Sequence, residues 1–191
     1  MLTQLLIQIV DWIFSFFTMA LLARVALQAA RAPARNPISQ FVIAVTDWAV
    51  VPARRIIPSA FGFDLPTLLL AWLTQGIFHA LVFGLFMAQA ILSPGSVFGI
   101  AIVAALATLR LGVYLLIAAV IISALLSWIN PYAPLAPLMN AIARPFLQPL
   151  QRVIPPIGGI DLSPLVLLLA LQVMLSLLAW MQRLVLPFFP L

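Results

Sequence analysis

Four long stretches of the chain are almost entirely apolar, and the segments between them hold most of the polar residues. A helix needs about 20 apolar residues to cross a hydrocarbon core of about 30 Å, because each residue advances it by about 1.5 Å. Each stretch is long enough, so the pattern predicts an all-α integral membrane protein with four transmembrane helices. The stretches cover residues about 5–23, about 65–92, a part of 97–129, and about 162–181.

The connections differ in charge, which predicts how the chain lies in the membrane. The second and third stretches are joined by Ser93-Pro94-Gly95-Ser96, an uncharged tight turn that makes them a helical hairpin. Most arginines lie in the two longer connections. Cytoplasmic loops are enriched in positive charge, so we expect both long connections in the cytoplasm and both termini outside, although Arg183 argues against this orientation. The arginines of the long connections are Arg24, Arg31, Arg35, Arg54, Arg55, Arg144 and Arg152.

Polar residues recur at helical spacing in both long connections, at about 37–57 and about 134–154. Near the start of each connection stands an asparagine followed by proline, Asn36 or Asn130, which favours the start of a helix. We therefore expect two short amphipathic helices in the cytoplasmic interface. A re-entrant segment is the alternative, but it would immerse exposed arginines in lipid at a high energetic cost. Three prolines are expected to break these helices: Pro52, Pro145 and Pro149.

The composition supports a membrane protein and excludes several other classes. Of 191 residues, 65% are hydrophobic and 7% are charged, against about 45–50% and about 25% in soluble domains. A secreted lipid-associated protein would usually have cysteines or a cleavable signal, and the sequence shows neither. The net charge of +5 does not indicate nucleic-acid binding, because the arginines form no block and no aromatic stacking platform accompanies them. We expect these arginines to contact anionic lipid headgroups.

One pattern of residues occurs twice, 97 positions apart, which indicates a duplicated structural unit. We predict two repeats, residues 1–92 and 97–191, each built as span, amphipathic segment and span. Because each repeat has two spans, both repeats have the same orientation and are related by an axis along the membrane normal. The matching positions are Pro52, Arg55, Pro58, Gly62, Asp64 and Gln75, followed by Pro149, Arg152, Pro155, Gly159, Asp161 and Gln172.

The doubled motif resembles the YggT family of integral membrane proteins over nearly the whole chain. The first copy runs from Asn36-Pro37 through Arg54-Arg55 to Asp64, and the second runs from Asn130-Pro131 through Arg152 to Asp161. The resemblance implies a location in the bacterial inner membrane or in plastids. It also implies links to osmotic-stress tolerance, potassium uptake, cell division, nucleoid distribution and assembly of a membrane cytochrome complex. An accessory or assembly role is the function that these links share most easily.

Two charged residues, Asp11 and Arg110, lie inside apolar stretches. Aligning the first stretch with the third at an offset of 99 makes their positions equivalent. We predict an ion pair between them near the axis, because an isolated charge at the bilayer centre costs at least about 2.5 kcal/mol. The alternatives are that one or both side chains reach an interface, or that they line a gated ion path.

An arginine and an aspartate flank the turn before the second span of each repeat, as Arg55 with Asp64 and Arg152 with Asp161. The structural interpretation is that each aspartate caps the following helix while the arginine binds the aspartate or a lipid phosphate. The functional alternative is a surface that binds a partner protein. The candidate contact residues are Arg54, Arg55, Pro58, Gly62, Asp64, Arg144, Arg152, Pro155, Gly159 and Asp161.

The remaining polar residues inside the spans are predicted to serve packing. Gln75 and Gln172 occupy equivalent positions, and an amide within the membrane needs an interhelical partner. His79 follows Gln75 by one turn, and we expect it to be packed or hydrogen-bonded and not to bind metal or haem. No nucleophile stands with a base and no phosphate loop is visible, so we expect neither catalysis nor a cofactor.

These features predict a non-enzymatic inner-membrane accessory, assembly or scaffold protein that contacts a protein partner or copies of itself. The alternative is a component of ion uptake, in particular of potassium. A pore needs several polar positions on one continuous face, and four spans are too few to enclose one easily. Conduction would therefore require an oligomer.

Overall fold

The computed structural model describes residues 1–30, 36–57, 64–86, 94–154 and 161–185, and all regular structure in these ranges is helical. The predicted all-α class is therefore confirmed. In chain order the helices are α1 (Leu2–Ala29), α2 (Pro37–Ile56), α3 (Leu65–Phe86), α4 (Pro94–Ile129), α5 (Ala136–Val153) and α6 (Ser163–Val185).

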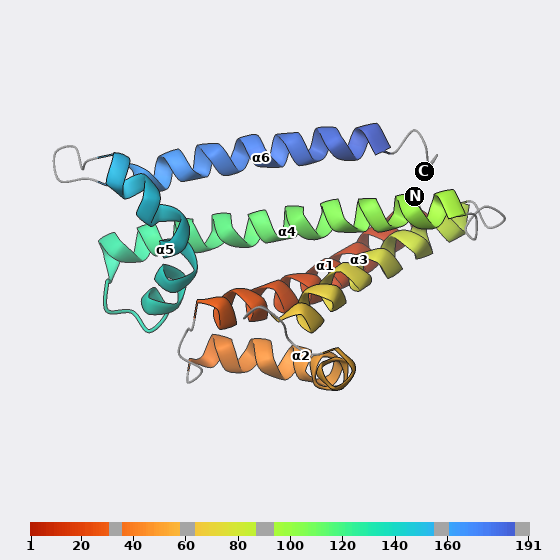
Figure 1. The fold of residues 1–191 in the computed structure, drawn as a ribbon, viewed down its shortest axis with the longest axis horizontal. Helices are drawn as coiled ribbons and strands as arrows, with labels where there is room; N and C mark the ends of the chain where they lie inside the picture. The colour runs from red at the N-terminus through yellow and green to blue at the C-terminus, as the bar shows by residue number, and fades with distance from the viewer. Residues whose placement is uncertain (31–35, 58–63, 87–93, 155–160, 186–191) are drawn as a thin grey trace.

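Helices α1, α3, α4 and α6 are long and apolar enough to cross a membrane, which confirms the four predicted spans. Helix α4 lies in the middle, with α6 on one side and α1 and α3 on the other (Figure 1). The start of α1 and the end of α6 lie at one end of the bundle, which we call the terminal end (Figure 1). Helices α2 and α5 lie toward the opposite end, which we call the connector end.

The three prolines expected to break the amphipathic segments lie inside continuous helices. Helix α2 runs through Pro52, and α5 runs through Pro145 and Pro149. A proline removes one backbone hydrogen bond and bends a helix, but packing on both sides can keep the helix continuous. Val50 and Leu147, which stand near these prolines, are 0% and 8% exposed and provide such packing.

The described part of the hairpin turn is helical where the sequence predicted a turn. The sequence predicts that Pro94, Gly95 and Ser96 belong to the turn, but α4 begins at Pro94. Proline is favourable in the first turn of a helix, because its missing N–H is not needed there and its φ angle already suits the helix. Residues 87–93, where the second span was predicted to end, lie outside the described residues.

The two Asn-Pro pairs do not start helices in the same way. Asn36 caps α2, because its Oδ1 accepts a hydrogen bond from the backbone N–H of Ile38 at 2.9 Å. Asn130 accepts from the backbone N–H of Tyr132 at 3.2 Å within a turn. Helix α5 begins only at Ala136, so the second amphipathic helix starts later than the asparagine suggested.

Helices α2 and α5 each bury one face against the spans, a contact that the sequence analysis did not specify. Val50 of α2 packs with Leu21 of α1 and Ala71 of α3. The buried face of α5 belongs to the main apolar core, which includes residues of α4 and α6 and Leu27 of α1. Helix α5 therefore joins the two halves of the chain. Its core residues are Leu138, Ile142, Ala143 and Leu147.

Candidate functional site

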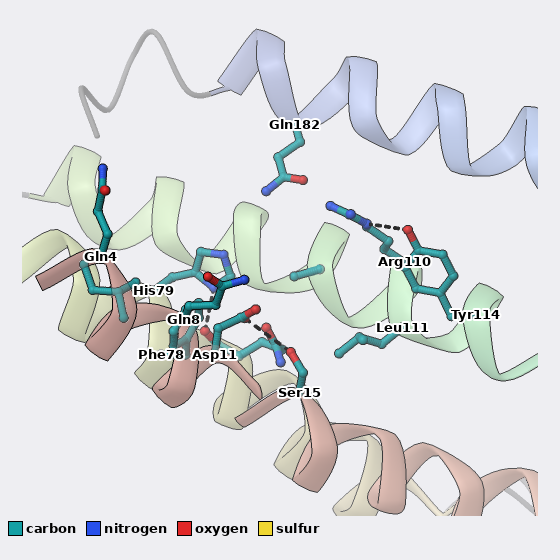
Figure 2. A pocket seen from close by; sticks show the side chains of 13 residues that line it. Gln4, Gln8, Asp11, Ser15, Phe78, His79, Arg110, Leu111, Tyr114 and Gln182 are labelled. Atoms are coloured by element: carbon teal, nitrogen blue, oxygen red, sulfur yellow. Dashed lines mark hydrogen bonds between the residues drawn. The ribbon is translucent and has the colours of Figure 1, made fainter. Parts of the chain in front are cut away.

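A cavity of about 560 Å³ lies among the spans, and nine of its lining residues are polar (Figure 2). Helix α4 contributes Arg110 and Tyr114 to its lining, and α6 contributes Gln182. The cavity therefore extends from the middle of α4 toward the terminal end. Helices α1 and α3 contribute the polar residues Gln4, Gln8, Asp11, Ser15, Gln75 and His79.

Asp11 and Arg110 both line this cavity, but each contacts a residue of its own helix (Figure 2). Ser15 donates to Asp11 at 3.3 Å. Arg110 Nε donates to the hydroxyl of Tyr114 at 3.3 Å, and its guanidinium lies 5.6 Å from the centre of the Tyr114 ring. Both salt bridges found among the described residues involve other side chains, so the predicted Asp11–Arg110 ion pair is not formed. Ser15 and Tyr114 are also 99 positions apart, so the two contacts are equivalent.

Gln75 and Gln172 have different surroundings despite their equivalent positions in the sequence. Gln75 is 2% exposed, and its Nε2 donates to Thr18 Oγ1 of α1 at 3.0 Å, which is the expected kind of interhelical bond. Gln172 is exposed on α6, and its side chain has no interhelical partner among the described residues. The position in α4 that corresponds to Thr18 is Ile117, which has no hydroxyl to accept the bond.

His79 is hydrogen-bonded and packed, as the sequence predicted. Its Nδ1 donates to the carbonyl oxygen of Gln75 at 2.8 Å, and its ring lies edge-on to Phe78 with 5.2 Å between the ring centres. Across the part of the chain that the structure describes, no three His, Cys, Asp or Glu side chains are grouped closely enough to hold a metal ion.

A charged contact that the sequence did not reveal joins α1 to α2. Arg24 lies 2.7 Å from the carboxylate of Asp47, and it also donates to the hydroxyl of Thr46 at 2.8 Å. The Arg24 side chain is only 11% exposed. Two features of the sequence could have indicated this contact: Arg24 stands at the end of an apolar stretch, and Asp47 lies on the polar face of the next amphipathic segment.

Asp64 stands directly before α3 and is 2% exposed. Its carboxylate pairs with Arg54 and not with Arg55, the partner that the sequence predicted. Successive residues of a helix point about 100° apart, so only one of the two arginines can face Asp64. Thr67 also donates to this carboxylate, at 2.6 Å. Burial by itself raises the pKa of Asp64, but the hydrogen bonds from Arg54 and Thr67 outweigh burial and hold the pKa below its ordinary value.

The second half makes the corresponding contact without an arginine. Gln151, 97 positions after Arg54, donates to Asp161 at 2.8 Å. Asp161 also accepts from the backbone N–H of Ser163 at 2.8 Å, so it caps α6 as predicted. The predicted partner Arg152 is exposed, and Gln151 takes its place. Burial favours a higher pKa for Asp161, but the hydrogen bonds from Ser163 and Gln151 lower it overall.

The remaining candidate contact residues are exposed or lie outside the described residues. Arg144, like Arg152, is exposed on α5. Pro58, Gly62, Pro155 and Gly159 fall in the two segments that the structure does not describe.

The chain matches a known protein family in two segments, and their spacing agrees with that of the doubled motif. Residues 3–86 and 100–182 match the family model described as CCB3/YggT, so the match covers most of the chain. The chain belongs to the CCB3/YggT family. The two matched segments of this family member begin 97 positions apart, which is also the offset of the motif. The resemblance inferred from the sequence is therefore confirmed, while the division into two parallel repeats stays a prediction.

Relatives of this family member occur in several bacteria. An uncharacterized protein of Pseudomonas aeruginosa is 36% identical over 168 residues, covering 87% of this chain and 84% of its own. An uncharacterized protein of Vibrio alginolyticus is 36% identical over 86% of this chain and 88% of its own. The uncharacterized protein YggT of Escherichia coli K12 is 34% identical over 84% of this chain and 82% of its own. No solved structure is significantly similar to the chain.

Proposed function

We propose that this protein is a non-enzymatic accessory or assembly protein of the bacterial inner membrane. In this proposal its connector end faces the cytoplasm and contacts a protein partner or a second copy of the chain. Family membership supports the membrane location, and the surface of α2 and α5 supports the contact.

The observation that carries the proposal is that the outward faces of α2 and α5 expose large apolar side chains together with arginines. On α2, Trp48 is 72% exposed and Ile56 is 81% exposed. On α5, Val153 is 79% exposed. Tryptophan and arginine are enriched at the centres of protein interfaces. Beside Arg54, which pairs with Asp64, the exposed arginines of these helices are Arg55, Arg144 and Arg152, which also suit anionic headgroups.

Ion pairs hold α2 in place, which supports a role as a preformed contact surface. Arg24 and Asp47 attach its middle to α1, and Arg54 and Asp64 attach its end to α3. A surface that is already ordered loses less conformational freedom when it binds a partner.

The test is to extract the protein from native membranes in mild detergent and to identify what remains bound. The variant reverses two exposed charges at the connector end, Arg55→Glu with Arg152→Glu. The matched control is Arg183→Glu, a charge reversal near the terminal end of α6. We expect the parent and the control to retain the same protein partner or homo-oligomer, and the double variant to lose it. Equal retention by all three proteins, with unchanged helix content, would contradict the proposal.

A second candidate function is ion uptake, and the polar cavity that contains Asp11 is the observation that favours it. A carboxylate inside a span could bind a potassium ion, but the guanidinium of Arg110 lines the same cavity and would repel cations. Potassium flux into liposomes, measured for the parent and for Asp11→Asn, separates the two functions. Flux that Asp11→Asn abolishes would support uptake, and an absence of flux in both would reject it.

A further inference from the structure

The polar cavity has two charges of opposite sign that do not neutralise each other directly. Asp11 and Arg110 each have a neutral partner on the same helix, and both of those hydrogen bonds are 3.3 Å long. Bonds of this length are weak for charged groups, which normally make contacts of about 2.7–2.9 Å. Both residues therefore retain the capacity to bind charged groups of a ligand.

A second cavity adjoins the polar one and is almost entirely apolar. It has a volume of about 500 Å³ and lies between the first half of α1 and the second half of α3. Ile7 and Phe78 line both cavities, so the two share a wall. Its other lining residues include Leu6, Val10, Leu81 and Leu85.

We infer that the two cavities together form a binding site for one zwitterionic phospholipid with an ethanolamine headgroup. The ammonium group of the lipid contacts the carboxylate of Asp11, and its phosphate contacts the guanidinium of Arg110. An acyl chain occupies the apolar cavity beyond Ile7 and Phe78. This site is separate from the arginines of the connector end and goes beyond the proposed function.

The charges in the cavity favour this ligand over simpler ones. A cation alone would leave Arg110 uncompensated, and an anion alone would leave Asp11 uncompensated. A zwitterion satisfies both, and the apolar cavity distinguishes a lipid from a small soluble zwitterion. Because the lining belongs to membrane-spanning helices, phospholipid is also the molecule present at the highest local concentration.

The test measures retention of one lipid molecule by the full-length protein in detergent, using native mass spectrometry during lipid titration. The probes are phosphatidylethanolamine, phosphatidic acid and phosphatidylglycerol with identical acyl chains. Asp11→Asn should weaken phosphatidylethanolamine binding about tenfold and leave phosphatidic acid binding unchanged. Arg110→Gln should weaken binding of both lipids. The matched control is Gln172→Leu, which changes an exposed polar residue of α6 outside both cavities.

A third variant tests the apolar part of the site. Gly84 lines the apolar cavity, so Gly84→Leu should weaken binding of long-chain phosphatidylethanolamine while leaving a short-chain analogue unaffected. If Asp11→Asn or Arg110→Gln does not fold, Asp11→Glu and Arg110→Lys keep the charge and change only the reach of the side chain. These two should bind more weakly than the parent and still prefer ethanolamine.

Three results would overturn the inference. Equal binding of all three lipids by the parent would indicate general contact with the bilayer. Unchanged phosphatidylethanolamine binding in both charge variants would show that Asp11 and Arg110 do not contact the lipid. A charge variant that alters the oligomeric state without altering lipid retention would show that a second copy of the chain occupies the cavity. None of these results bears on the connector-end test, which uses different residues.

Discussion

Arg54 and Asp64 form an ion pair that fastens the end of α2 to the start of α3. The two partners differ in exposure, because Asp64 is almost completely buried whereas the Arg54 side chain is 37% exposed. The corresponding residues of the second half, Gln151 and Asp161, make a neutral-to-charged contact that is exposed. We therefore expect the contact in the first half to contribute more to the stability of the fold than the contact in the second half.

Replacing Asp64 should destabilise the fold more than replacing Asp161. Asp64→Asn leaves a buried amide beside a guanidinium without its counter-charge, and we expect a loss of about 2 kcal/mol. Asp161→Asn is the control, and because asparagine also caps helices its cost should stay below about 0.5 kcal/mol. Thermal melting in detergent, followed by circular dichroism, compares the two variants. Equal shifts would show that burial of Asp64 does not matter.

The lowered pKa of Asp64 predicts how stability depends on pH. A carboxyl whose folded-state pKa is below its unfolded value of about 3.9 stabilises the fold above that pH. This contribution is lost as the pH falls through the folded-state pKa. The melting temperature of the parent should therefore fall between about pH 5 and about pH 3 more than that of Asp64→Asn. Parallel curves for the two proteins would contradict this assignment, while any slope shared by both can come from Asp161.

Arg24 and Asp47 should be energetically coupled. The arginine is largely buried, but the Asp47 side chain is 45% exposed, so we expect a coupling of about 1 kcal/mol. A double-mutant cycle with Arg24→Gln and Asp47→Asn, read by thermal melting, measures this value. The matched cycle pairs Asp47→Asn with Arg55→Gln, an exposed arginine of α2, and should give a value near zero. A similar coupling in both cycles would indicate general charge effects.

The predicted orientation can be tested because the sequence contains no cysteine. Gly95 is exposed at the start of α4, where an added Cβ would meet no group outside its own helix turn among the described residues within 4 Å, and Tyr132 is 94% exposed at the connector end. A membrane-impermeant thiol reagent added to spheroplasts should label Gly95→Cys directly and Tyr132→Cys only after lysis. The reverse pattern would place the connector end outside the cell.

The spans and the amphipathic segments could be predicted from sequence because lipid imposes strict length and polarity requirements on them. The sequence could not predict which individual side chains contact one another. Arg54 and Arg55 are adjacent in the sequence, and only the rotation of α2 against α3 decides which of them reaches Asp64. The pattern placed Asp11 and Arg110 at equivalent positions, but equivalence does not bring side chains into contact.

The prediction that prolines break the two amphipathic helices was wrong for a related reason. Helix propensity describes an isolated segment, in which Pro52 or Pro149 would end a helix. In the folded chain, the buried faces of α2 and α5 add packing energy on both sides of each proline. The Arg24–Asp47 contact was missed because it joins residues of two different elements, and no local pattern links them.

Helix α4 has 36 residues, so it is about 54 Å long, whereas the hydrocarbon core of a bilayer is about 30 Å thick. Its C-terminal end extends past the end of α1 at the connector end (Figure 1). A helix of fixed length responds to a thinner or thicker bilayer by changing its tilt. Helix α5 follows α4 and packs on it, and it also packs on Leu27 of α1. We therefore expect a change in the tilt of α4 to shift α5, and the connector surface to which it belongs, relative to the membrane surface.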